Sequence, residues 1–223
     1  MTTSTPHFVQ SYERLVDELL KQHALDEAMS RAVGGNYEHG GAIEADILTE
    51  LGLTTGTSIV DLGCGSGRLS TALGGRFGTS IDYLGIDIVQ SMLDYAAAKA
   101  PPTYRFVLNR DLGIPAPDET ADFVVAFSVF THLRTSETLT YLADAKRVLR
   151  PGGAVVFSFL TLPQHWRMLI GDLKGRLRGT LPHLVTYTQP RTIGRWARQL
   201  GFQLEQFNAP ESIGHRIAVL RRS

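Results

Sequence analysis

Three glycines and two acidic residues, placed around two short apolar segments, form the pattern in this chain that most directly suggests chemistry. Positions 59–67 read Ile-Val-Asp-Leu-Gly-Cys-Gly-Ser-Gly and contain Asp61, Gly63, Cys64, Gly65 and Gly67. Glycine permits a tight turn and a close approach of backbone to a ligand. Asp87 closes the second apolar segment, 20 positions after the last glycine. At the tip of a parallel strand, an acid suits the two hydroxyls of a ribose.

The residues around the glycines indicate which nucleoside ligand this turn would hold. A dinucleotide-binding loop reads G-x-G-x-x-G or G-x-G-x-x-A. Here the pattern is G-x-G-x-G, and Arg68 stands where the third small residue would be. A carboxylate at Asp61 would repel a pyrophosphate but suits a ligand that carries an ammonium or a sulfonium group. The turn therefore favours S-adenosylmethionine (SAM) over NAD.

Alternating apolar segments on both sides of the turn predict a parallel α/β sheet. Helical periodicity over 8–31 predicts an added N-terminal helix or helix pair, with a glycine-rich connector at 33–41 before a helix at 42–51. Segment 161–188 interrupts the alternation and is either a lid or a surface excursion. The expected strands are 58–62, 81–86, 104–108, 121–127, 153–160 and a terminal pair, 202–208 and 213–220; the expected helices are 67–75, 89–99, 136–149 and 190–200.

Five ordered motifs within residues 37–160 resemble those of the class I SAM-dependent methyltransferases. They are Ile59–Gly67, Leu84–Leu93, Val107–Pro115 with Asp118, Ala121–Leu133 and Arg147–Gly153. The resemblance implies one domain with a doubly wound, seven-stranded, mostly parallel Rossmann-like sheet. Its parts would be an N-terminal helical cap (1–41), a SAM-binding core (42–160), a substrate lid inserted after the fifth strand (161–188), and a C-terminal helix and strand pair (189–223). The stretches Phe-Ser-Val-Phe-Thr-His-Leu and Gly-Asn-Tyr-Glu-His-Gly-Gly look most like a bacterial subgroup, which does not specify a substrate.

The same resemblance implies contacts with the cofactor. Asp111 would accept a hydrogen bond from the adenine amino group, with the N–H of Leu112 facing a ring nitrogen. Three assignments stay open: Asp61 either meets the methionine ammonium or holds the turn, Asp87 either binds the ribose or caps helix 89–99, and Met92 either touches adenine or lies in the core. The expected cofactor-binding residues are Asp61, Gly63, Cys64, Gly65, Gly67, Asp87, Ile88, Met92, Arg110, Asp111, Leu112, Phe127, Ser128 and Val129.

His132 is the candidate general base, because it follows the fourth strand and an imidazole titrates near neutral pH. Its alternative role is to cap the next helix or to hydrogen-bond the loop. Tyr37 and His39 precede the glycine motif and either contact SAM or the substrate or serve as a structural connector. Methyl transfer from a sulfonium needs mainly alignment and desolvation, so a base is required only for a weakly acidic acceptor.

Composition limits the remaining possibilities. The 22 basic and 22 acidic residues balance, which disfavours nucleic acid as a partner, and no metal-ligand spacing is visible. A single cysteine, the lack of a signal-like N-terminus and the lack of a membrane-span-length apolar run favour a cytoplasmic protein. The expected function is methyl transfer to a small-molecule or glycan-linked acceptor by a monomer or homodimer, with S-adenosylhomocysteine (SAH) as product. The alternatives are a SAM-binding regulatory subunit that has lost catalysis and an RNA methyltransferase.

Overall fold

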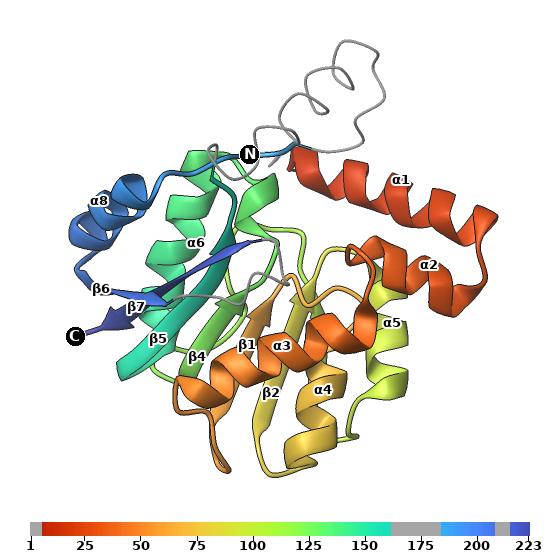
Figure 1. Cartoon of the computed structure of the whole chain (residues 1–223), viewed down its shortest axis with the longest axis horizontal. Coiled ribbons are helices and arrows are strands. Elements are labelled where there is room, and N and C mark those ends of the chain that lie inside the picture. The colour runs from red at the N-terminus through yellow and green to blue at the C-terminus, as the bar shows by residue number, and fades with distance from the viewer. Residues whose placement is uncertain (1–5, 162–183, 208–214) are drawn as a thin grey trace.

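The computed structural model describes residues 6–161, 184–207 and 215–223. Within these residues, one open sheet is flanked by helices (Figure 1). The strands are β1 (Ser58–Leu62), β2 (Asp82–Asp87), β3 (Arg105–Leu108), β4 (Ala121–Ala126), β5 (Leu149–Phe159), β6 (Phe202–Phe207) and β7 (Arg216–Arg222). The helices are α1 (His7–Gln22), α2 (Leu25–Ala32), α3 (Tyr37–Glu50), α4 (Arg68–Phe77), α5 (Gln90–Lys99), α6 (Thr135–Val148) and α8 (Pro190–Leu200), with a short 3-10 helix, η1 (Phe130–His132).

The sheet has the expected doubly wound, seven-stranded, mostly parallel topology. Its strand order is β3-β2-β1-β4-β5-β7-β6, and β7 alone runs antiparallel to its neighbours. The order reverses between β1 and β4, which pair in parallel. Ligands of open α/β sheets bind beyond the carboxyl ends of the strands at such a reversal. The fold therefore directs attention to the loops that follow β1, β2 and β4.

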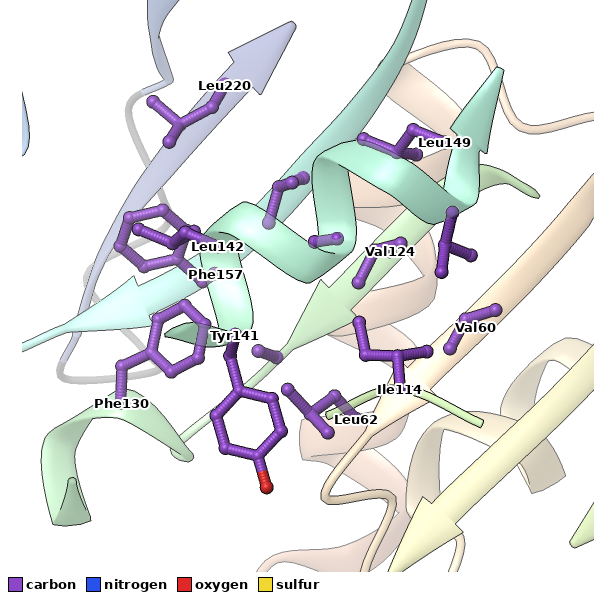
Figure 2. Packing of buried hydrophobic residues seen from close by; sticks show 14 of the residues in the cluster. Val60, Leu62, Ile114, Val124, Phe130, Tyr141, Leu142, Leu149, Phe157 and Leu220 are labelled. Carbon is purple, nitrogen blue, oxygen red and sulfur yellow. The ribbon is translucent and has the colours of Figure 1, made fainter. Parts of the chain in front are cut away.

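Alternate residues of the central strands face opposite sides of the sheet and are buried on both. Val60 and Val124 pack with Leu142 of α6 in the cluster that Figure 2 shows. Their neighbours Ile59 and Val125 belong to the opposite cluster, which includes residues of α3 and α4. Burying one such side chain contributes ~1.5–3 kcal/mol, so these two layers fix the strand tips in place.

Most boundaries lie within three residues of the sequence prediction, and two differ by more. The connector 33–41 ends early, because α3 begins at Tyr37 and includes Gly40 and Gly41. The fifth strand begins at Leu149 rather than at residue 153, since Leu149 already pairs with Ala121 of β4. The N-terminal segment forms the helix pair α1 and α2, which lie side by side in Figure 1. Most of segment 161–188, namely 162–183, lies outside the described residues.

Candidate active site

The glycine-rich turn after β1 is tied to β2 by its backbone. The N–H groups of Gly63 and Cys64 donate to the carbonyl oxygen of Ile86 at 2.7 and 3.0 Å. Gly63 has a φ of +69°, and an added Cβ would lie 2.5 Å from a methyl carbon of Val129. Only glycine therefore fits at this position, where the turn passes the loop after β4.

Helices α2 and α3 support the same turn from the other side. The Ser66 hydroxyl donates to the carbonyl oxygen of Met29 at 2.9 Å, and the Tyr37 hydroxyl donates to the carbonyl oxygen of Ser66 at 2.7 Å. Tyr37 thus supports the turn and is not part of the cavity wall, and its contact with SAM or the substrate stays a prediction. Gly67 is also outside the wall; its φ is +83°, and an added Cβ would lie 2.6 Å from the Cβ of Ala96 on α5.

A cavity of about 400 Å³ lies over the turn, where β1, β2 and β4 end. Residues from all three strand tips and from η1 contribute to its wall. Of the residues that the sequence singles out, the wall contains Asp61, Gly63, Cys64, Gly65, Asp87, Ile88, Met92, Phe127, Ser128, Val129 and His132. His39 lines a smaller second cavity instead, together with Arg68 and Ser128 of the first. The structure therefore brings most of the expected site together.

Asp87 organises the cavity as well as lining it. One carboxylate oxygen accepts the N–H of Gly65 at 2.8 Å, and the other accepts the N–H groups of Ile88 at 2.7 Å and Val89 at 3.0 Å. Burial raises the pKa of this carboxyl, and the three backbone donors act against that rise. Asp87 thus joins the turn to the start of α5. It also lines the cavity, and its binding to the ribose stays a prediction.

Asp61 lies in a less polar environment. It is 3% exposed, and the hydroxyl of Tyr83 donates to its carboxylate at 2.5 Å. Burial, the largest cause, raises the pKa of Asp61 to about 8, while the Tyr83 hydrogen bond lowers it and the charges of Glu44 and Asp87 raise it further. The charge of Arg68 also lowers the pKa of Asp61 but does not offset burial, so the environment favours the protonated form.

An ion pair in the cavity wall was not anticipated from the sequence. Arg68, the first residue of α4, donates from Nε to Glu44 at 3.1 Å and from Nη1 to the Val33 carbonyl oxygen at 2.9 Å, and its Nη2 also pairs with Glu44. Glu44 is 3% exposed, and burial raises its pKa while Arg68 lowers it. An added Cβ at Gly41 would collide with the Arg68 backbone, so this glycine permits α3 and α4 to approach. Two features of the sequence could have indicated this ion pair. They are the pair Gly40-Gly41 and the arginine that stands where a small residue was expected.

The backbone holds one ring nitrogen of His132. Its Nδ1 lies 2.8 Å from the carbonyl oxygen of Leu184. A carbonyl oxygen can only accept, so Nδ1 carries the hydrogen and Nε2 of the neutral ring has the lone pair. The ring also meets Tyr12 of α1 edge-on, with centroids 5.6 Å apart. This tautomer is the one that a general base requires.

The loop after β3 is placed differently from the expectation. Arg110 pairs with Glu13 of α1 at 2.5 Å, while Asp111 and Leu112 are exposed and none of the three lines the cavity. Asn109 lines it instead, and its side-chain amide donates to the Gly113 carbonyl oxygen at 2.8 Å. The adenine contacts of Asp111 and Leu112 and the cofactor contact of Arg110 stay predictions.

Much of the remaining wall is apolar and comes from segments remote in sequence, although Arg31 and Thr131 also line it. Helix α1 contributes Phe8, Tyr12 and Leu15, whose spacing had indicated only a helix. Leu160 and Val185 add to this wall on either side of residues 162–183, and His215 lines both cavities. Among the described residues, no group of three or more His, Cys, Asp or Glu side chains is arranged to hold a metal ion. None of the described helices combines the length and apolarity that crossing a membrane would take.

The fold resembles that of solved methyltransferase structures. The structure of magnesium protoporphyrin IX methyltransferase from Synechocystis PCC 6803, solved with bound SAH, covers 97% of this chain and 98% of its own, with a TM-score of 0.69 and 18% sequence identity. The same enzyme solved with bound SAM gives a TM-score of 0.68. The shared architecture is the Rossmann-like methyltransferase fold.

The family comparison covers the centre of the chain. Residues 59–153 match the family model described as "Methyltransferase domain". Residues 59–153 therefore form a methyltransferase domain, and the chain shares the fold of a methyltransferase solved with bound SAH and with bound SAM.

Curated relatives share moderate identity. Malonyl-acyl-carrier protein O-methyltransferase of Serratia marcescens is 28% identical over 206 residues, which are 87% of this chain and 76% of the relative. Demethylmenaquinone methyltransferases of Lactococcus lactis and Tropheryma whipplei are 30% and 35% identical. The chain spans 58% and 54% of the lengths of those two relatives.

Proposed function

We propose that this enzyme transfers the methyl group of SAM to an oxygen atom of a small acceptor with an apolar body, and that His132 removes the acceptor's proton. The observation that carries the proposal is the position of His132. Its ring lines the same cavity as the glycine turn, and the Leu184 carbonyl fixes the tautomer that can accept a proton.

The cofactor would occupy the part of the cavity over the turn. Asp87 would bind the ribose hydroxyls, because it lines the cavity at the tip of β2. Asp61 would lie near the cationic end of SAM, where a positive charge restores its ionised state. Met92 is 2% exposed within an apolar cluster, and the part of its side chain that lines the cavity would contact adenine. Each role follows from the placement of the side chain in the wall.

The acceptor would occupy the apolar end of the cavity. Phe8, Leu133, Leu160 and Val185 line this region near His132, and such a wall fits hydrocarbon better than it fits a sugar. Two kinds of relatives carry acceptor names, malonyl-acyl-carrier protein and demethylmenaquinone, and these names support a small-molecule or carrier-linked acceptor. The balanced net charge of the chain supports neither RNA nor DNA as substrate.

Two measurements test this function. Calorimetry with SAH should show binding to the wild-type protein. Methyl transfer from radiolabelled SAM should then occur with an apolar hydroxy compound selected from cell metabolites, and His132→Gln should lower kcat by ~10²-fold or more, the usual contribution of a general base. SAH affinity should stay within about twofold in this variant. Binding of SAH without turnover of any metabolite pool would favour the regulatory subunit, and unchanged kcat in His132→Gln would remove the base role.

A further inference from the structure

The outer face of α8 carries a row of three arginines. Arg191, Arg195 and Arg198 are exposed and follow one another at intervals of four and three residues, which places them on one face of the helix. On the opposite face, Ile193 and Trp196 are buried in the core. The first and the last Cα of the row lie about 10 Å apart along the helix axis. The row is therefore a compact strip of positive charge.

The arginines of this row differ from most other arginines of the chain in their surroundings. Most arginines among the described residues form an ion pair, as Arg150 does with Asp122 at 2.8 Å. Within the same part of the chain, no acidic side chain forms an ion pair with the row, and Arg195 donates to the neutral hydroxyl of Thr192 at 3.3 Å. Acidic and basic residues balance over the whole sequence, yet the charge of this strip is not matched.

The row begins close to the larger cavity. The chain that leads into α8 contains Val185 of the cavity wall, and the hydroxyl of Thr186 donates to the Leu133 carbonyl oxygen, just before α6, at 2.9 Å. At the other end, Lys146 of α6 donates to the Leu200 carbonyl oxygen of α8 at 2.6 Å. The two helices therefore run side by side (Figure 1). A partner bound along α8 would reach the segment that carries Val185.

The chemistry of the row favours an acidic protein surface over other anionic partners. Guanidinium groups pair with carboxylates through two parallel hydrogen bonds in one plane. Nucleic acid binding depends on many phosphate contacts, whereas this strip supplies three arginines in a chain without net charge. Binding to a lipid surface requires exposed apolar side chains beside the charges. Among the described residues, the exposed large apolar side chains lie outside α8 and are Leu25, Leu108 and Leu112.

We propose that the outer face of α8 is a docking surface for an acidic helix of another protein. Carboxylates with the same spacing on that helix would pair with Arg191, Arg195 and Arg198. Because the row begins close to the cavity wall, the bound partner would lie next to the cavity. This proposal does not depend on methyl transfer, and its failure would leave the function proposed above unchanged.

Two alanine-based peptides of about 20 residues test this surface, because chains of that length and composition form helices in water. One peptide carries glutamates with the spacing of the arginines, and the other carries glutamines at the same positions. Calorimetry at about 0.01 M salt should show the glutamate peptide binding about tenfold more tightly, as three exposed ion pairs together would give. The preference should shrink at about 0.15 M salt, where charges are screened more strongly.

Two triple variants separate the row from the net charge of the protein. The α8 variant should lose the preference for the glutamate peptide, and it combines Arg191→Gln, Arg195→Gln and Arg198→Gln. The control variant removes three exposed charges from other elements and should keep the preference, and it combines Arg14→Gln, Arg105→Gln and Arg150→Gln. Both variants should unfold cooperatively on heating, which shows that the fold is retained.

The remaining outcomes would overturn the proposal. They are equal binding of the two peptides by the wild type, a preference that survives in the α8 variant, and an equal loss in both variants, which would reflect net charge alone. Vesicles of phosphatidylglycerol with phosphatidylcholine, and a short RNA duplex, test the other anionic partners. If either bound the wild type more tightly than the glutamate peptide and lost binding only in the α8 variant, the partner would be a membrane or a nucleic acid, and the assignment to a protein would be wrong.

Discussion

Replacing Asp61 with asparagine should make the stability of the protein less sensitive to pH. The folded-state pKa of Asp61 is raised from 3.8 to about 8, mainly by burial. Between these values the folded protein keeps a proton that the unfolded chain has released, so its stability falls as pH rises. The slope approaches 1.36 kcal/mol per pH unit, which amounts to about 3 kcal/mol between about pH 5 and pH 8. Asparagine stays neutral and retains an oxygen for the Tyr83 hydroxyl, so it should escape this loss.

Urea unfolding of both proteins across this pH range measures the effect. The free energy of unfolding of the wild type, minus that of Asp61→Asn, should fall by about 3 kcal/mol from pH 5 to pH 8. Asp94→Asn, at an exposed position on α5, should show no such trend and controls for the general titration of the chain. A difference that stays constant within about 0.5 kcal/mol would show that Asp61 is ionised in the folded state, and the reasoning from its burial would be wrong.

Three further perturbations address the rest of the site. Asp87→Ala should weaken SAM binding by ~1.5–3 kcal/mol and also lower Tm, because three backbone N–H groups lose their acceptor; unchanged affinity by calorimetry would place the ribose elsewhere. Tyr37→Phe should cost ~0.5–1.5 kcal/mol of unfolding free energy by losing the bond to Ser66, with kcat retained; a large loss of kcat at unchanged stability would instead give Tyr37 a catalytic role. Turnover should persist after EDTA treatment, and activity that is lost and then restored by Mg²⁺ would reveal a metal site.

The sheet and the turn were predictable because their signals are local. The run Ile59–Leu62 is apolar except for Asp61 and begins with two β-branched residues, and each glycine of the turn follows it within five positions. Both faces of the strand are buried, so a mostly apolar run was the correct pattern for it. The acid at Asp87 followed from the same logic, since it ends the neighbouring parallel strand in register with β1.

The errors arose where tertiary contacts override local preference. Gly40 and Gly41 read as a connector because glycine destabilises a helix interior by ~1 kcal/mol. In the fold, Gly41 instead permits the close approach of α3 to the backbone of Arg68. The fifth strand was expected to begin at residue 153, yet Leu149 already pairs with β4. Such contacts depend on a second element and leave no periodic signal in the first.

Residues from distant segments were the least predictable part of the site. Ser158 and His215 come together because β5 and β7 pair antiparallel, with Phe159 opposite Arg216. Phe8 and Tyr12 reach the cavity because α1 packs against α2, whose Met29 lies in one apolar cluster with Met92 of α5. An apolar stripe on a helix indicates that one face is buried, but it does not indicate which element covers that face. The residues at the strand tips could therefore be predicted from the sequence. The residues that form the opposite wall of the cavity could not.

The two buried acids of the site differ in the number of hydrogen-bond donors that act against the effect of burial on their pKa. Asp87 has three backbone N–H donors, which act against the burial that raises its pKa. Asp61 has one hydroxyl donor from Tyr83, too little to offset burial, and its pKa reaches about 8. Asp87 can therefore hold the turn and α5 together whether or not a ligand is bound. Asp61 gains its charge only when a positive group comes near, so binding of the SAM cation and loss of the Asp61 proton should occur together. Calorimetry of SAM binding in buffers of different ionisation enthalpy should detect that proton near neutral pH, and a heat independent of the buffer would place the SAM cation away from Asp61.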